Sequence, residues 1–149
     1  MPAPVVLVAA ALAACAIALS FAARAAQWDR TPEGIAFLEG GIGAEEVTAL
    51  EAERARWPLE VRTAARRSGA WLADVHLCIR DAAGRLVFDR QLQAPWLLID
   101  LPPGRYDIVG VHDGEVARQV VTVPARGHRE SVLYFPVAGQ TAPHRPGED

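Results

Sequence analysis

The sequence contains no lysine, so all of its side-chain positive charge apart from histidine is carried by arginine. Its 15 basic residues are outnumbered by 18 acidic residues, which gives a formal net charge of −3. A general nucleic-acid-binding domain carries a basic excess, so this composition argues against that class. The length of 149 residues and the hydrophobic fraction of 51% predict one globular domain.

Cysteine is also scarce, and the two residues are Cys15 and Cys78. Cys15 lies inside an apolar N-terminal stretch, so Cys78 is the single thiol of the chain that follows. One thiol cannot form an internal disulfide. We therefore expect packing alone to hold the fold together, even in an oxidising compartment.

The N-terminal stretch Val5–Ala23 consists of 19 uncharged residues. It predicts that residues 1–25 are a signal peptide or a membrane-anchor helix, and Ala23-Arg24-Ala25 has the form of a cleavage site. Two alternatives stay open: residues 5–23 remain as a membrane attachment, or the lipobox-like Leu12-Ala13-Ala14-Cys15 directs lipidation of Cys15. Each of the three outcomes places the rest of the chain in the periplasm or on the outer face of the cytoplasmic membrane.

The remaining chain divides into four predicted segments. Residues 26–43 contain several glycines and no clear periodicity, and we expect a lead-in linker. Residues 44–57 predict one helix, with glutamates in the first turn, arginines in the last turn and a proline after its end. Residues 58–137 predict a β-sandwich domain, and residues 138–149 predict a disordered tail.

From residue 58 onward, apolar and polar residues alternate with a period of two, which indicates half-buried β-strands. Turn sequences separate the strands, and no helical crossover lies between them. The predicted fold class is all-β, a seven-stranded antiparallel Greek-key sandwich preceded by the short helix and the N-terminal signal or anchor helix. The predicted strands are 59–66, 71–80, 85–91, 96–101, 106–112, 115–123 and 130–137.

Three motifs resemble carboxypeptidase regulatory-like domains: Leu101-Pro102-Pro103-Gly104-Arg105-Tyr106, Asp113-Gly114 and Val121-Thr122-Val123-Pro124. The hairpin from Trp71-Leu72-Ala73-Asp74-Val75 to Asp81-Ala82-Ala83-Gly84 is similar to the same family. The resemblance covers about residues 40–137. It implies a transthyretin-like sandwich, a fold widely used as a non-catalytic module. Gly40-Gly41-Ile42-Gly43 with Glu45-Glu46 resembles the start of small exported proteobacterial proteins that carry such a domain. The enzymatic 5-hydroxyisourate hydrolases end in Tyr-Arg-Gly-Ser, which this sequence lacks, so that activity is not expected.

Structural roles are predicted for four residues, three of which lie in the corner around residue 104. Pro103 pre-sets the turn, and Gly104 accepts a positive φ. The pattern Leu-x-Pro-Gly-x-Tyr has the form of a tyrosine corner, so Tyr106 is predicted to be buried with its hydroxyl bonded to an upstream backbone group. Trp71 is expected on the core face of its strand.

Asp74, His76 and Cys78 alternate along predicted strand 71–80 and would share one face. An acid, an imidazole and a thiol could form a metal site or a Cys-His pair. Neighbours on one face of a strand lie about 6.5–7 Å apart, so a solvent-exposed face with three unconnected polar residues is the alternative. The other histidines form no ligand pair and lie on a strand, in a loop and in the tail: His112, His128 and His144.

The glycine-rich Gly40-Gly41-Ile42-Gly43 precedes the predicted helix but lacks the Gly-Lys-Ser/Thr of a phosphate-binding loop. The glutamates that follow it would repel a phosphate, so no cofactor is predicted. Exposed aromatic rings can stack on sugars. We expect Trp57, Trp71 and Phe88 to pack inside, and Trp96 to be the most exposed of the four.

Three functional hypotheses follow. The first is a non-catalytic exported sandwich with an interaction or structural role in the cell envelope. The second is a protein that binds carbohydrate or another envelope ligand through exposed aromatics. The third is a metal-binding or hydrolytic protein that uses His76 and Cys78. The expected partner is an envelope protein or a glycan, and not a nucleic acid.

Overall fold

The structure is a computed structural model, and it describes residues 28–136. The predicted signal or anchor segment 1–25, which includes Cys15, and the predicted tail 138–149 lie outside the described residues. Between residues 28 and 136, no helix has the length and apolar character that crossing a bilayer requires.

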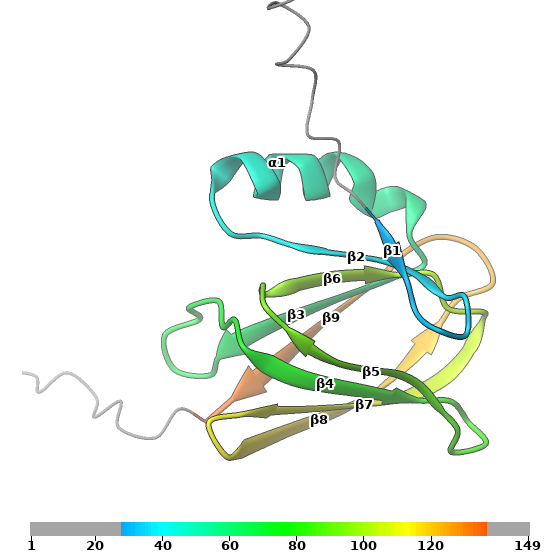
Figure 1. Ribbon diagram of the computed structural model, residues 1–149. Helices are drawn as coiled ribbons and strands as arrows, with labels where there is room; N and C mark the ends of the chain where they lie inside the picture. The colour runs from blue at the N-terminus through cyan, green and yellow to red at the C-terminus, as the bar shows by residue number, and fades with distance from the viewer. Residues whose placement is uncertain (1–27, 137–149) are drawn as a thin grey trace, which may run out of the picture.

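Two β-sheets face each other as a sandwich, and one helix lies outside them (Figure 1). The strands are β1 (Asp29–Arg30), β2 (Ala36–Gly40), β3 (Leu59–Ala65), β4 (Val75–Arg80), β5 (Leu86–Leu92), β6 (Trp96–Ile99), β7 (Gly104–His112), β8 (Glu115–Val123) and β9 (Arg129–Phe135). One sheet has the order β1-β2-β6-β3-β9, and the other has the order β5-β4-β7-β8. The all-β sandwich predicted from the alternation is confirmed.

The strand count and one pairing differ from the prediction. The described residues form nine strands rather than seven, because β1 and β2 lie in the segment 26–43 that was expected to be a linker. β2 buries Phe37 and Leu38 in two different apolar clusters, so it lacks the alternation that marks a half-exposed strand. The pair β3 and β9 is parallel, so the sandwich is not wholly antiparallel.

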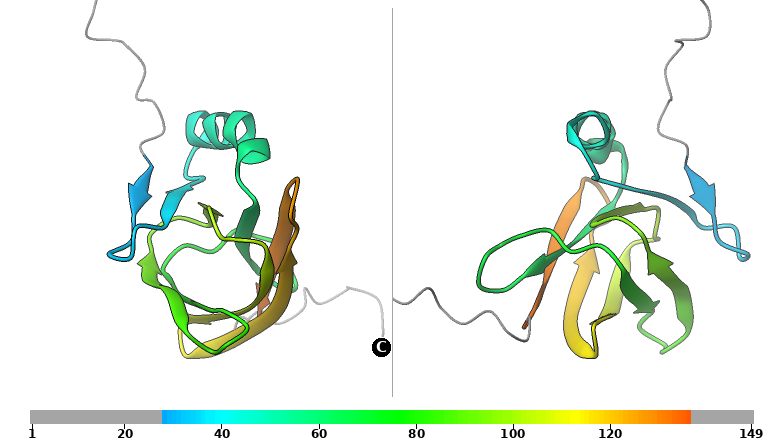
Figure 2. Two further views of the ribbon diagram at one scale, coloured as in Figure 1. Left: turned by 90° about the vertical axis from the view of Figure 1, so that its right-hand side faces the viewer. Right: turned by 60° about the vertical axis from the view of Figure 1, so that its left-hand side comes forward.

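The two sheets face each other (Figure 2). Their inward-facing side chains form one apolar core. Val75, Leu77 and Ile79 of β4 are fully buried in it, as the alternation predicts. Gly110 of β7 faces Phe135 of β9 in the opposite sheet. An added Cβ there would lie 2.7 Å from the ring of Phe135, so the absence of a side chain permits this approach.

The helix α1 (Ala44–Glu53) and the 3-10 turn η1 (Arg54–Arg56) correspond to the helix predicted over 44–57, and they lie outside the five-stranded sheet (Figures 1 and 2). Leu50 packs with Leu38, Trp96 and Leu98 in a second apolar cluster. Trp96, predicted to be the most exposed aromatic residue, is therefore buried. The prediction was wrong because the helix covers the outer face of β6.

The predicted turns are present. Tyr106 is buried, and its hydroxyl donates a 2.7 Å hydrogen bond to the carbonyl of Pro102, which confirms the tyrosine corner. Gly104 follows Pro103 and has a φ of 152°. Asp113 and Gly114 have φ values of 47° and 79°, as a two-residue type I′ hairpin turn requires.

The strand predicted over 71–80 begins only at Val75, because Asp74 has a φ of 57° and interrupts the extended chain. Trp71 makes an isolated bridge to Ala64 and is 47% exposed, so its predicted core position was wrong. Its ring instead contacts Trp96 edge-on, with the ring centroids 6.2 Å apart.

Candidate functional site

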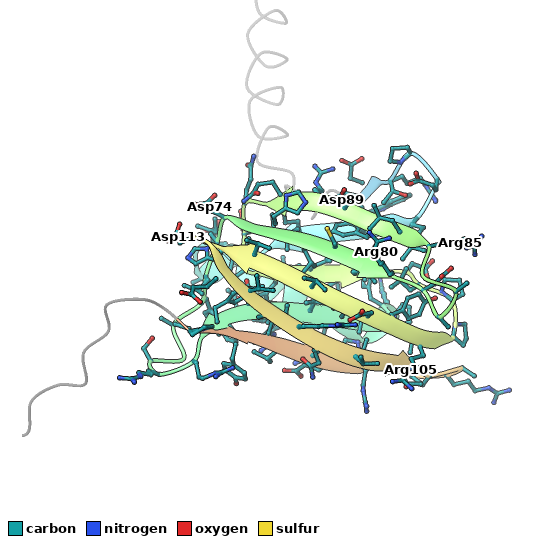
Figure 3. All side chains as sticks on the ribbon, turned by 90° about the horizontal axis from the view of Figure 1, so that it is seen from below. Asp74, Arg80, Arg85, Asp89, Arg105 and Asp113 are labelled. Atoms are coloured by element: carbon teal, nitrogen blue, oxygen red, sulfur yellow. The ribbon has the colours of Figure 1, made fainter. Side chains whose placement is uncertain are left out.

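The strands β4 and β5 bring three donor side chains together on the outer face of the four-stranded sheet. His76 and Cys78 are two residues apart on β4, and Asp89 of β5 lies directly opposite Cys78. His76 is therefore diagonal to Asp89 across the pair of strands. Figure 3 looks onto this face of the sheet and labels Asp89 and Arg80 on the neighbouring strands.

A register shift near the end of β4 decides which residue faces the thiol. Arg80 pairs with Leu86, and an unbroken register would place Phe88 opposite Cys78. The shift places Asp89 there instead. Since a slip by one residue turns side chains to the opposite face, this bulge keeps Phe88 in the core and Asp89 in solvent.

His76 and Cys78 both contact the same carboxylate oxygen of Asp89. His76 Nε2 lies 2.5 Å from Asp89 Oδ1, and the Cys78 thiol donates to the same oxygen over 3.4 Å. One ligand atom from each residue lies within 4.8 Å of the other two. The side chains of His76 and Asp89 are 48% and 47% exposed, and Cys78 is half-buried. Nitrogen, sulfur and oxygen donors of these types are those that zinc accepts.

The contacts set the protonation states of the thiol and the carboxylate. The hydrogen bond from His76, and then that from Cys78, lowers the pKa of Asp89. Desolvation, and then the hydrogen bond to Asp89, raises the pKa of Cys78. At neutral pH the pair is therefore a thiol and a carboxylate, which is the form in which Cys78 donates to Asp89. This state does not favour a thiolate nucleophile.

Asp74, which was predicted to share a strand face with His76 and Cys78, is not part of this cluster. It precedes β4 in a left-handed conformation, and its carbonyl lies 3.4 Å from Nδ1 of His112. Figure 3 shows it beside Asp113 at one end of the sheet. The cross-strand residue Asp89, which the sequence analysis did not single out, takes its place.

A second polar cluster is buried near the end of the helical segment. Glu60 of β3 is fully buried, and its carboxylate pairs with Arg54 over 2.9 Å and with Arg62. His128 lies 3.0 Å from the same carboxylate through Nε2 and 2.7 Å from the carbonyl of Trp57 through Nδ1. His128, which the sequence places in a loop, makes these contacts because the loop before β9 folds onto β3. We interpret this cluster as a structural contact that holds the helical segment, β3 and the loop before β9 together.

In the glycine-rich segment before the helix, two backbone N–H groups are already bonded to a side chain of the helix. The carboxylate of Glu46 accepts hydrogen bonds from the backbone N–H groups of Gly41 and Ile42, at 3.1 and 3.0 Å. A phosphate would need these same donors. The geometry therefore agrees with the sequence-based argument against a phosphate site here.

An aromatic groove lies between the helical segment and β1. Trp28 is 53% exposed, and the guanidinium of Arg30 lies 4.9 Å from its ring centroid. The sequence analysis did not single out Trp28. The groove is lined by Trp28, Arg30, Ala36, Glu53, Arg56, Trp57 and Asp100.

The outer face of β7 and β8 carries aliphatic side chains, which we call the valine strip: Val109, Val111, Val116 and Val120. Three of them are exposed, and Val116 is 59% exposed. Val111 lies opposite Val116, Arg118 opposite Val109 and Asp107 opposite Val120. The two-bond ion pair of Asp107 with Arg118, at 2.8 and 2.5 Å, therefore lies between Val120 and the other valines of the strip.

The valine strip directly borders the cluster of His76, Cys78 and Asp89, which we call the donor cluster. Val109 pairs with Cys78 in the β4–β7 register, and Val111 pairs with His76. Within residues 28–136, the outer face of the four-stranded sheet therefore presents donor atoms and aliphatic groups side by side. Comparison of the chain with protein-family profiles, with curated proteins and with solved structures found no match.

Proposed function

We propose that this chain is an exported, non-catalytic β-sandwich module that binds a protein of the cell envelope through the valine strip. The observation that carries the proposal is the exposure of Val111, Val116 and Val120 on one sheet face. Exposed aliphatic side chains gathered on one sheet face favour an interaction surface, because covering them removes apolar area from water.

The chemistry of the strip favours a protein partner over a glycan. Its methyl groups offer neither a hydrogen-bond donor nor an aromatic ring face to a sugar. The neighbouring charges of Asp107 and Arg118 already satisfy each other. The partner that fits is therefore a protein surface with its own aliphatic side chains, which would bury the strip without leaving a charge unpaired.

Two further parts of the proposal rest on the sequence. The uncharged stretch Val5–Ala23 supports export to the periplasm or to the outer face of the cytoplasmic membrane. The motifs that resemble carboxypeptidase regulatory-like domains support a transthyretin-like sandwich, and a two-sheet fold is compatible with it. Cell fractionation, with mass analysis of the mature N-terminus, distinguishes cleavage after Ala25, lipidation of Cys15 and a retained anchor.

The binding role is tested by affinity capture from envelope extracts, with quantitative identification of the captured proteins. The variants are Val116→Arg and Val120→Arg, and the matched control is Tyr134→Arg, another exposed strand residue on the other sheet. We expect recovery of a specific protein to fall about tenfold in both valine variants, equal to about 1.4 kcal/mol, and to stay unchanged in the control. Recovery that does not depend on the valines would contradict the proposal.

A second candidate function, glycan binding, is favoured by the groove that contains Trp28. An exposed indole ring flanked by Arg30, Glu53 and Asp100 combines a stacking surface with hydrogen-bonding groups. Titration with envelope glycans, followed by tryptophan fluorescence, tests it. A saturable change that Trp28→Ala abolishes and Trp71→Ala preserves would support the groove, and a flat titration would exclude it for the glycans used.

A further inference from the structure

We propose that His76, Cys78 and Asp89 form a Zn²⁺ site on the outer face of the four-stranded sheet. The donor set carries this inference: one imidazole nitrogen, one sulfur and one carboxylate oxygen lie within 4.8 Å of one another. It goes beyond the binding module proposed above and does not depend on it.

The geometry needs only a small adjustment to accept the ion. Zinc bonds of about 2.0–2.3 Å in a tetrahedron separate neighbouring donor atoms by roughly 3.3–3.7 Å. Cys78 Sγ and Asp89 Oδ1 already lie 3.4 Å apart. His76 Nε2, now 2.5 Å from that oxygen and within 4.8 Å of Cys78 Sγ, has to move about 1 Å away from the oxygen and towards the sulfur, and its half-exposed ring has room to do so.

The backbone beneath the site is fixed. β4 is hydrogen-bonded on both sides, to β5 and to β7, and Cys78 faces Asp89 directly in that ladder. The site therefore sits on paired strands and not on a loop, which lowers the entropic cost of bringing the ligands together.

Zinc binding would replace the hydrogen bonds of His76 and Cys78 to Asp89 with bonds from all three side chains to the metal. The S–H bond of Cys78 breaks, the sulfur bonds to zinc, and the proton passes to solvent. Asp89 binds through a carboxylate oxygen, and His76 binds through the lone pair of Nε2 in the tautomer that carries its hydrogen on Nδ1, so the Nε2 hydrogen bond to Asp89 is given up. A thiolate and a carboxylate then balance the two charges of the ion, and the fourth position faces solvent, where water can occupy it.

The donor types select among metals. Ca²⁺ and Mg²⁺ prefer six or more oxygen ligands, of which this cluster offers one carboxylate. A blue-copper site needs a second imidazole beside the thiolate, and the donor group found within residues 28–136 contains a single histidine. Zn²⁺ fits one sulfur, one nitrogen and one oxygen ligand.

Calorimetric titration of the untagged full chain with ZnCl₂, under reducing conditions and in detergent solution, tests the site. We expect one Zn²⁺ to bind per cluster, with an affinity that Cys78→Ser and Asp89→Asn each reduce about tenfold or more. Asp74→Asn is the matched control: it removes a nearby carboxylate that the structure places outside the cluster, and it should bind as the wild type does.

A second measurement reports on the thiolate itself. Co²⁺ added to the wild type should give a sulfur-to-cobalt charge-transfer band in the near ultraviolet, and Cys78→Ser should abolish it while circular dichroism confirms that the variant is folded. Failure of the wild type to bind zinc, or binding that survives Cys78→Ser unchanged, would overturn the proposal.

Discussion

At the scale of single residues, Tyr106 shows how a local sequence pattern fixes a contact. Its hydroxyl bonds to the carbonyl of Pro102 within the same corner, and burial raises the pKa of the phenol. All the residues involved lie within a few positions of one another in the sequence. A short-range motif could therefore predict both the burial of the ring and the hydrogen bond.

We predict that Tyr106→Phe lowers the free energy of unfolding by about 1 kcal/mol or slightly more, because the variant loses the hydroxyl and leaves the carbonyl of Pro102 without this donor. Urea denaturation of the variant and the wild type under identical conditions measures the difference. Coincident unfolding curves would show that the corner contributes nothing to stability.

The carboxyl group of Asp81 is expected to make the stability of the fold depend on pH. Its carboxylate accepts backbone hydrogen bonds from Arg85 and Ala83, and the bond from Arg85 is the main reason that its pKa is lowered. A carboxyl pKa that is lower in the folded state contributes stability above its unfolded value of 3.8, and this contribution is lost as pH falls through the folded pKa.

We therefore expect the stability of the wild type to decrease below about pH 4, and that of Asp81→Asn to decrease less steeply over the same range, because the amide keeps an acceptor oxygen but does not titrate. Urea midpoints measured from about pH 7 down to about pH 2 provide the comparison. Parallel pH profiles for the two proteins would rule out this role for Asp81.

One of the three residues of the donor cluster could not be predicted from the sequence. His76 and Cys78 were identified from their alternation on one strand, but Asp89 lies 11 residues from Cys78 in the sequence. Its position depends on the bulge in the β4–β5 pair. A simple register across the tight turn would have turned Asp89 toward the core, so alternation alone could not identify it.

At the scale of elements, the buried Glu60 connects the end of the helical segment, β3 and the loop before β9. The sequence shows Glu60 as a polar residue between two apolar ones, which predicts a solvent-exposed face. Glu60 is buried instead, because Arg54 of the helical segment and His128 of the loop before β9 both pair with its carboxylate. The helical segment also explains why Trp96 is buried.

We predict that Glu60→Gln lowers the free energy of unfolding by about 2 kcal/mol, because partly buried guanidinium groups lose their anionic partner. Glu130→Gln is the matched control. Glu130 pairs with the same Arg54, but its side chain is 41% exposed, so the expected loss is under about 1 kcal/mol. Equal losses in the two variants, measured by urea denaturation at neutral pH, would show that burial of the carboxylate is not what matters.

At the scale of the whole molecule, the two sheets differ in what covers them. The helix covers the outer face of the five-stranded sheet, and among the described residues no element covers the outer face of the four-stranded sheet (Figures 1 and 2). Alternation predicted the two-sheet sandwich, because each strand carries its own pattern. It could not predict that β3 lies in parallel beside β9, since that pairing joins segments about 70 residues apart.

The valine strip is the surface through which we propose that the chain binds its partner, and a photocrosslinking experiment tests this binding most directly. A photoreactive phenylalanine analogue replaces Val116 or, as the control, Tyr134 in cells that produce the full chain. We predict a discrete crosslinked protein from position 116 and none from position 134. No adduct at position 116, or the same adduct from both positions, would contradict the proposal.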